Sequence, residues 1–220
     1  MSELGGLGGM LPATAWERLL DHGAARRFRR GEALIRQDAP GGFVLLLRRG
    51  QVKVERTELG DRTMLLALRG PGEVLGEVTA FDKGPRSATV TALQPCDTTL
   101  LTNGTFLRLC DDLDITEVVI RHLLARMRDG EARQAALAHL RAERRLARAL
   151  LWLLPGTNGA GGPAVLPLTQ EEIAAAAGLS RAAVAAELGR LRDQKVVATA
   201  PGRVEILEPH RLRSIADGHR

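Results

Sequence analysis

The sequence has few of the residues that build metal and disulfide sites. Only two of its 220 residues are cysteine, Cys96 and Cys110, and neither belongs to a CxxC motif. No histidine lies between His22 and His122. This scarcity argues against a disulfide framework, a zinc site and an iron–sulfur cluster. It also excludes the clustered histidines of a cupin-like metal oxygenase. We therefore predict that the protein is not an enzyme and has no metal site.

Long apolar runs are also missing. No run approaches the ~20 residues that span a membrane, and the start, MSELGGLGGMLP, lacks the basic and apolar regions of a signal peptide. The hydrophobic fraction of 45% and charged fraction of 26% are typical of a soluble globular protein. The net charge of +5 suits a polyanionic partner. We expect a cytoplasmic protein without a membrane partner, whose first residues are a flexible lead-in.

Glycine is unevenly distributed, and this divides the chain. Between residues 28 and 109, short apolar runs alternate with glycine-containing breaks such as Gly41-Gly42, Gly60 and Gly70. Many short strands at near-regular spacing predict a β-sandwich or jelly roll. Glycine almost vanishes from residue 115, where we predict a long helix to about 138 and a shorter one over 143–154. A Gly- and Pro-rich loop over 155–163 follows.

Residues 169–191, TQEEIAAAAGLSRAAVAAELGRL, predict two short helices joined by a tight turn. Thr169 and Glu172 have the spacing of a capping box. Gly178 is the left-handed residue that ends the first helix, and Ser180 can cap the second. Two capped helices with a Gly-containing turn are typical of a helix-turn-helix, whose second helix enters the DNA major groove. An ordinary helical hairpin is the alternative.

A β-hairpin is predicted directly after these helices. Two β-prone runs, 196–199 and 204–207, flank the turn signal Pro201-Gly202, and Arg203 beside that turn could reach a phosphate. We therefore predict an α+β protein in three parts. These are an N-terminal β jelly-roll domain over 13–113, a long dimerisation helix over 114–140 and a C-terminal winged helix over 141–220.

With these parts in place, the chain resembles the CRP/FNR family of bacterial transcription regulators. The resemblance rests on Gly76-Glu77-Val78, on residues 84–90 (GPRSATV), on Arg145-Leu146-Ala147 and on residues 169–191. It implies a cyclic-nucleotide-binding fold or a derivative of it, a dimer helix, and a reader of palindromic double-stranded DNA. RNA polymerase becomes a candidate partner on the same ground.

The effector residues implied by the resemblance make chemical sense. Arg86 can give forked hydrogen bonds to a phosphodiester, with further donors from Ser87 and backbone N–H groups. Glu77 can accept from a ribose 2′-hydroxyl, and Gly76 allows a close approach. An ion pair between Glu77 and Arg86 that merely holds a turn is the alternative. The full set of expected effector-binding residues is Gly76, Glu77, Arg86, Ser87, Ala88, Gly130 and Glu131.

The helical part of this set departs from the family pattern. The resemblance implies adjacent hydroxyl residues that contact the base, but Gly130 and Glu131 stand there. The effector could be cAMP, another cyclic nucleotide or a different signal, or the β domain could be only a dimerisation scaffold. Haem is not excluded by residue type, since His22, His122 and His139 are present.

The dimer and DNA interfaces are predicted from helix faces. Coiled-coil spacing on the long helix selects Ile120, Leu123, Met127, Gln134 and Leu137, together with Gly130. In the second reader helix, Arg181 can contact guanine or only a phosphate. Ala182 and Ala186 replace a Glu and an Arg of the best-known cAMP-responsive relatives, so the DNA consensus should differ. The predicted DNA-binding residues are Thr169, Gln170, Ser180, Arg181, Ala182, Ala186, Arg190 and Arg203.

Overall fold

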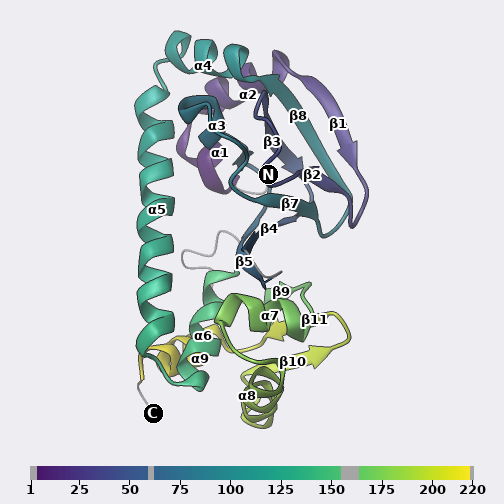
Figure 1. Cartoon of the computed structure of the whole chain (residues 1–220), viewed down its shortest axis with the longest axis vertical. Helices are drawn as coiled ribbons and strands as arrows, with labels where there is room; N and C mark the ends of the chain where they lie inside the picture. The colour runs from purple at the N-terminus through teal and green to yellow at the C-terminus, as the bar shows by residue number, and fades with distance from the viewer. Residues whose placement is uncertain (1–3, 59–61, 155–163, 219–220) are drawn as a thin grey trace. The chain divides into compact units, whose positions relative to one another are not determined.

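The computed structural model describes residues 4–58, 62–154 and 164–218 (Figure 1). The side chains of residues 62 and 134–138 lie outside the description, as do Gly60 and the predicted loop over 155–163. The chain divides into two compact units. The first comprises residues 1–57 and 68–129, and the second comprises 58–67 and 130–220.

Two antiparallel sheets build the β domain. One has the order β1-β8-β3-β6 and the other β2-β7-β4-β5. The strands are β1 (Ala24–Phe28), β2 (Ala33–Ile35), β3 (Phe43–Arg49), β4 (Val52–Glu58), β5 (Arg62–Arg69), β6 (Val74–Leu75), β7 (Thr89–Ala92) and β8 (Cys96–Thr102). The predicted β-roll is thus confirmed. Strand β1 was not predicted, because its sequence AARRF is largely exposed and lacks a buried apolar run.

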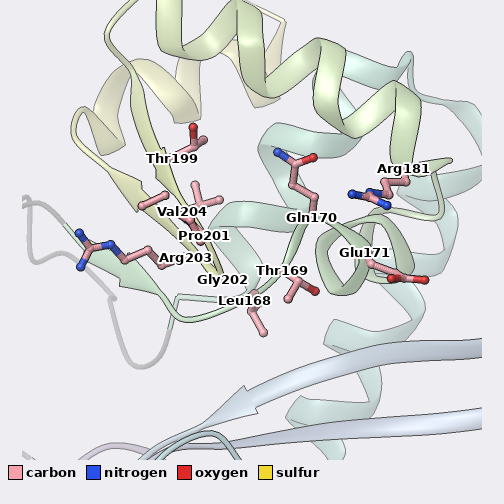
Figure 2. Close-up of a pocket in the computed structure, with 11 residues that line it drawn as sticks. Leu168, Thr169, Gln170, Glu171, Arg181, Thr199, Pro201, Gly202, Arg203 and Val204 are labelled. Carbon is pink, nitrogen blue, oxygen red and sulfur yellow. The ribbon is translucent and has the colours of Figure 1, made fainter.

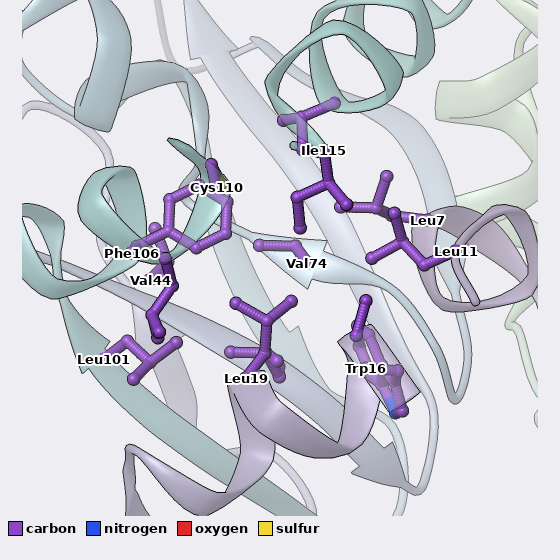
Figure 3. Packing of buried hydrophobic residues seen from close by; sticks show 14 of the residues in the cluster. Leu7, Leu11, Trp16, Leu19, Val44, Val74, Leu101, Phe106, Cys110 and Ile115 are labelled. Carbon is purple, nitrogen blue, oxygen red and sulfur yellow. The ribbon is translucent and has the colours of Figure 1, made fainter. Parts of the chain in front are cut away.

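The described part of the predicted lead-in, from residue 4 onward, contributes Leu7 and Leu11 to the core and is therefore not a flexible segment. Leu7 and Leu11 belong to the same buried cluster as Leu19 and Phe106 (Figure 3). They belong to or adjoin α1 (Gly6–Met10), which α2 (Ala13–Asp21) follows. A domain start at residue 13 therefore omits buried residues. The glycines of α1 permit close docking, since Gly8 N–H donates to the Gly72 carbonyl at 2.7 Å.

Two further helices lie within or directly after the region that was predicted to consist of short strands. These are α3 (Val78–Asp82) and α4 (Asn103–Asp112). Thr102 caps α4 by accepting from the Thr105 N–H at 3.1 Å, a local signal that the strand interpretation overlooked. Both cysteines are free and buried, and burial raises the pKa of the Cys110 thiol to about 12.

The long helix α5 (Thr116–His139) and the following α6 (Ala142–Trp152) match their predicted ranges closely. The remaining elements are β9 (Ala164–Leu166), α7 (Gln170–Ala177), α8 (Arg181–Asp193), β10 (Val197–Ala200), β11 (Arg203–Ile206) and α9 (Pro209–Asp217). Strand β9 adds a third strand to the wing, in the order β10-β11-β9. None of the described helices is long and apolar enough to cross a membrane.

The local signals of the helix-turn-helix are confirmed. Thr169 and Glu172 form both bonds of the capping box, and Gly178 ends α7 with φ +60°. Ser180 accepts from the Ala183 N–H at 3.2 Å at the start of α8. Val184, Leu188 and Leu191 are buried on the inner face of α8.

Candidate effector and DNA-binding sites

Five of the predicted effector residues meet around one small cavity of the β domain. Gly76, Glu77, Arg86, Ser87 and Ala88 line it. The other lining residues are Ile35, Val54, Leu75, Val78, Thr79, Val90 and Arg126. The cavity holds about 60 Å³, whereas small-molecule sites typically measure about 300–1,000 Å³. In this conformation it has room for about two waters.

Arg86 is a buried cation surrounded by neutral acceptors. Its side chain donates to the carbonyl oxygens of Gly76 at 2.8 Å and Phe43 at 2.6 Å, and to Thr79 Oγ1 at 2.7 Å. Its guanidinium also lies 4.7 Å from the centre of the Phe43 ring. Only 2% of the residue is exposed. Burial lowers the pKa of Arg86, and the charge of Glu77 opposes that shift.

Gly76 is required by this arrangement. Its φ is +82°, and a Cβ at this position would lie 2.3 Å from Arg86 Nη1. A larger residue would therefore be strained in its backbone and would also displace the guanidinium.

Glu77 is bound by a residue that sequence reasoning missed. Its Oε1 lies 2.5 Å from Nη1 of Arg126 on α5, and Glu77 is only 3% exposed. Within the described residues Glu77 forms no ion pair with Arg86, so the alternative of a Glu77–Arg86 turn pair is wrong. Helix α5 carries four arginines. Nothing in their spacing distinguishes Arg126, because its role depends on a contact with a residue 49 positions away.

A second ionic contact lies one turn earlier on α5. His122 Nε2 is 3.5 Å from Glu73 Oε2, and Arg69 Nε is 3.9 Å from Glu73 Oε1. Burial would raise the pKa of Glu73. The nearby His122 side chain and the charges of Arg69 and Arg126 outweigh burial and hold that pKa below its ordinary value of 4.5. His122 and Arg126 thus bind two carboxylates on either side of strand β6.

The remaining α5 predictions have mixed outcomes. Gly130 and Glu131 are exposed residues of the second unit, and their effector role stays a prediction. Ile120 and Met127 are exposed at 42% and 62%, whereas Leu123 is half-buried against the core of its own β domain. Leu124, exposed at 46%, extends the outward apolar face instead. The side chains of Gln134 and Leu137 lie outside the described residues.

A groove of about 560 Å³ separates the start of the helix-turn-helix from the wing. Figure 2 shows Arg181 and Glu171 on one side of it and Arg203 on the other. The lining residues are Leu168, Thr169, Gln170, Glu171, Arg181, Thr199, Ala200, Pro201, Gly202, Arg203 and Val204. Four predicted DNA-binding residues therefore share one groove. Glu171 was not predicted, and its carboxylate would oppose a nearby phosphate.

The other predicted DNA contacts lie along α8. Ser180, Ala182 and Ala186 are exposed. Arg190 donates from Nη1 to both carboxylate oxygens of Glu187, at 2.9 and 3.1 Å. It is therefore held by its own helix in this conformation.

Arg145, in the segment Arg145-Leu146-Ala147 on which the family resemblance partly rests, contacts the C-terminal end of α7. Its Nε donates to the Ala177 carbonyl at 3.2 Å, and its Nη2 donates to the Gly178 carbonyl. These bonds satisfy carbonyl groups at the C-terminal end of α7. Leu146 and Ala147 beside it are fully buried. The segment is therefore a support for the helix-turn-helix.

Comparison with known proteins agrees with this geometry. A model of the cyclic nucleotide-binding domain matches residues 25–112, and a model of the Crp-like helix-turn-helix domain matches residues 144–215. The chain is 34% identical over 194 residues to the cyclic AMP receptor protein of Thermus thermophilus, covering 88% of each. It is 32% identical to a CRP-like cAMP-activated global transcriptional regulator of Mycobacterium tuberculosis, covering 71% of this chain and 72% of the relative.

Solved structures have the same fold. The c-di-GMP responsive regulator CLP of Xanthomonas campestris matches with a TM-score of 0.74, over 90% of this chain and 99% of that one. Their identity is 23%, so this likeness concerns the fold alone. The match to the Thermus receptor protein extends across both domains and exceeds 30% identity. The chain therefore belongs to the CRP/FNR family of transcription regulators.

Proposed function

We propose that this regulator binds a cyclic nucleotide at Arg86 and, as a homodimer, reads a palindromic DNA site. The observation that carries the effector proposal is the environment of Arg86. Buried charges in proteins are normally paired, yet among the described residues no carboxylate lies within ion-pair distance of this guanidinium. An anionic ligand would supply the missing charge.

The surrounding groups suit a ribose phosphodiester. The Ser87 hydroxyl is exposed beside Arg86 and can donate to a phosphate oxygen. Glu77 can accept from a 2′-hydroxyl once its contact with Arg126 loosens. The apolar side chains of Ile35, Val54 and Val78 line the rest of the cavity. Two relatives are named for cAMP, which makes cAMP the first nucleotide to test.

One observation favours a second candidate, a regulator that needs no ligand. The cavity is too small for a nucleotide, and the Glu77 carboxylate is already paired with Arg126. A protein that remained in this form would use its β domain as a dimerisation scaffold. We favour nucleotide control, because a scaffold has no need for a buried cation that lacks an ion pair within the described part of the chain.

The DNA proposal rests on the groove and on the outward face of α5. Arg181 and Arg203 are exposed at the groove. Neither forms a hydrogen bond or an ion pair with the described part of the chain, so both can contact phosphates or bases. Ile120, Leu124 and Met127 offer an apolar surface to a second copy. A two-fold dimer places two α8 helices on successive half-sites. A regulator with this role would act in the cytoplasm, and RNA polymerase would be a further partner.

Calorimetry with cAMP, cGMP and c-di-GMP tests the effector proposal. Binding of one nucleotide should weaken by a factor equivalent to about 2–5 kcal/mol in Arg86→Ala, which loses a charge-assisted contact in a buried site. Ser87→Ala is the matched control and should lose less, because it removes one neutral donor. If no cyclic nucleotide binds the wild type at millimolar concentration while DNA binding is retained, the ligand-independent candidate is the correct one.

A further inference from the structure

The exposed face of α8 has almost no hydrogen-bonding capacity along its centre. Opposite the buried Val184 and Leu188, the helix presents Ala182, Ala186 and Gly189. The first two carry only a methyl group, and the third carries no side chain. A helix-turn-helix contacts base edges mainly with the N-terminal residues of this helix. In that binding mode, Ala182 and Ala186 would face the bases without any side-chain donor or acceptor, and Gly189 would add none further along the helix.

In the N-terminal turns of α8, within the part of the chain that the structure describes, Arg181 is the side chain that remains free to read a base by hydrogen bonding. Arg181 is exposed in the first turn and forms no hydrogen bond or ion pair with the described part of the chain. Arg190 is bound to Glu187 through two hydrogen bonds. Arg192 and Asp193 lie at the C-terminal end of α8, away from its N-terminal turns.

We propose, on the basis of the DNA-binding function above, that each half-site is specified by one guanine and by thymine methyl groups. Arg181 would donate to O6 and N7 of the guanine. The methyl groups of Ala182 and Ala186 would contact the C5-methyl groups of thymines, which project into the major groove. Specificity is then a property of these three side chains. In each DNA half-site, one base pair is then recognised by hydrogen bonds, and thymine is preferred at the neighbouring positions.

The test begins with DNA sites selected from a random duplex pool by the wild-type protein, with and without cAMP. Dissociation constants are then measured at fixed salt for duplexes altered at one base. Replacing the contacted G·C pair by A·T should weaken binding about 5- to 150-fold per half-site, and Arg181→Ala should remove this discrimination. Replacing a contacted thymine by uracil should weaken binding about four-fold for each methyl group lost.

Matched variants assign the methyl effect to its residues. The double variant Ala182→Gly with Ala186→Gly should lose sensitivity to uracil. Ala183 lies away from this exposed face, so the control variant Ala183→Gly should keep its sensitivity to uracil. It lowers helix propensity in the same way as the other glycine substitutions. Circular dichroism verifies that each variant is folded.

Two results would overturn the inference while leaving the proposed function intact. One is a selected half-site in which discrimination at two or more base pairs, other than the thymines that respond to uracil, survives Arg181→Ala. The other is wild-type binding that does not change when uracil replaces thymine. A protein that selects no DNA site under either condition would contradict the proposed function itself, and the inference would fall with it.

Discussion

The contact between Arg126 and Glu77 should contribute measurably to the stability of the β domain. The two charges lie 2.5 Å apart, with side-chain exposures of 24% and 3%. At an effective dielectric constant of about 20, this separation corresponds to roughly 7 kcal/mol of attraction before desolvation is counted. Removing one partner of a buried pair usually costs about 3–5 kcal/mol. Because Arg126 is partly exposed, and Arg86 still offers Glu77 a positive charge, we expect about 2–3 kcal/mol for Arg126→Leu.

A double-mutant cycle with Glu77→Gln isolates this contact. In the Glu77→Gln background, Arg126→Leu should cost at least about 1.5 kcal/mol less than it does in the wild type. The assay is urea unfolding at pH 7 and one protein concentration, since dimer stability depends on concentration. If Arg126→Leu changes the free energy of unfolding by less than about 0.5 kcal/mol, comparable to a surface substitution, the contact does not hold α5 to the effector cavity.

Three further predictions concern the same domain and its dimer face. Gly76→Ala should destabilise the fold by about 1–3 kcal/mol and weaken nucleotide binding, since its Cβ would meet the Arg86 guanidinium; urea unfolding and calorimetry measure the two effects, and normal values for both would refute the steric argument. The pKa of Glu73 is lowered in the folded state, so its stabilisation is present above pH 4.5 and should be lost as the pH falls. Urea unfolding at pH 7 and at about pH 3 should therefore show a smaller pH effect in Glu73→Gln than in the wild type, and an equal effect would assign it to other groups. Leu124→Glu should yield a folded monomer in light scattering, whereas Leu123→Glu should chiefly lower stability; a folded dimer for Leu124→Glu would place the interface elsewhere.

The parts of the fold that were predictable depend on local signals. The helix-turn-helix was recognisable because Thr169, Glu172, Gly178 and Ser180 satisfy the ends of their own helices within three or four residues. The wing followed from two β-prone runs around Pro201-Gly202. Such features require no knowledge of distant parts of the chain, so a sequence pattern is sufficient to identify them.

The parts that were missed depend on tertiary contacts. Helix α1 has the sequence GLGGM, whose helix propensity is poor, and it is stabilised by burying Leu7 and by docking on Gly72. Leu123 and Leu124 are adjacent and equally apolar, so spacing alone could not decide which faces the core. Arg126 was overlooked for the same reason, since only the fold brings it to Glu77.

We propose that nucleotide binding at Arg86 and DNA binding at α8 are coupled. Fluorescence anisotropy with a selected palindromic duplex gives the DNA dissociation constant with and without saturating cAMP. The allosteric coupling free energy between two binding sites is typically about 1–3 kcal/mol, which changes an affinity roughly 5- to 150-fold. Each ligand must change the affinity for the other by the same factor. The account predicts that cAMP tightens DNA binding within this range, that DNA tightens cAMP binding by the same factor, and that Arg86→Ala removes both effects. Equal DNA affinity with and without bound cAMP would contradict it.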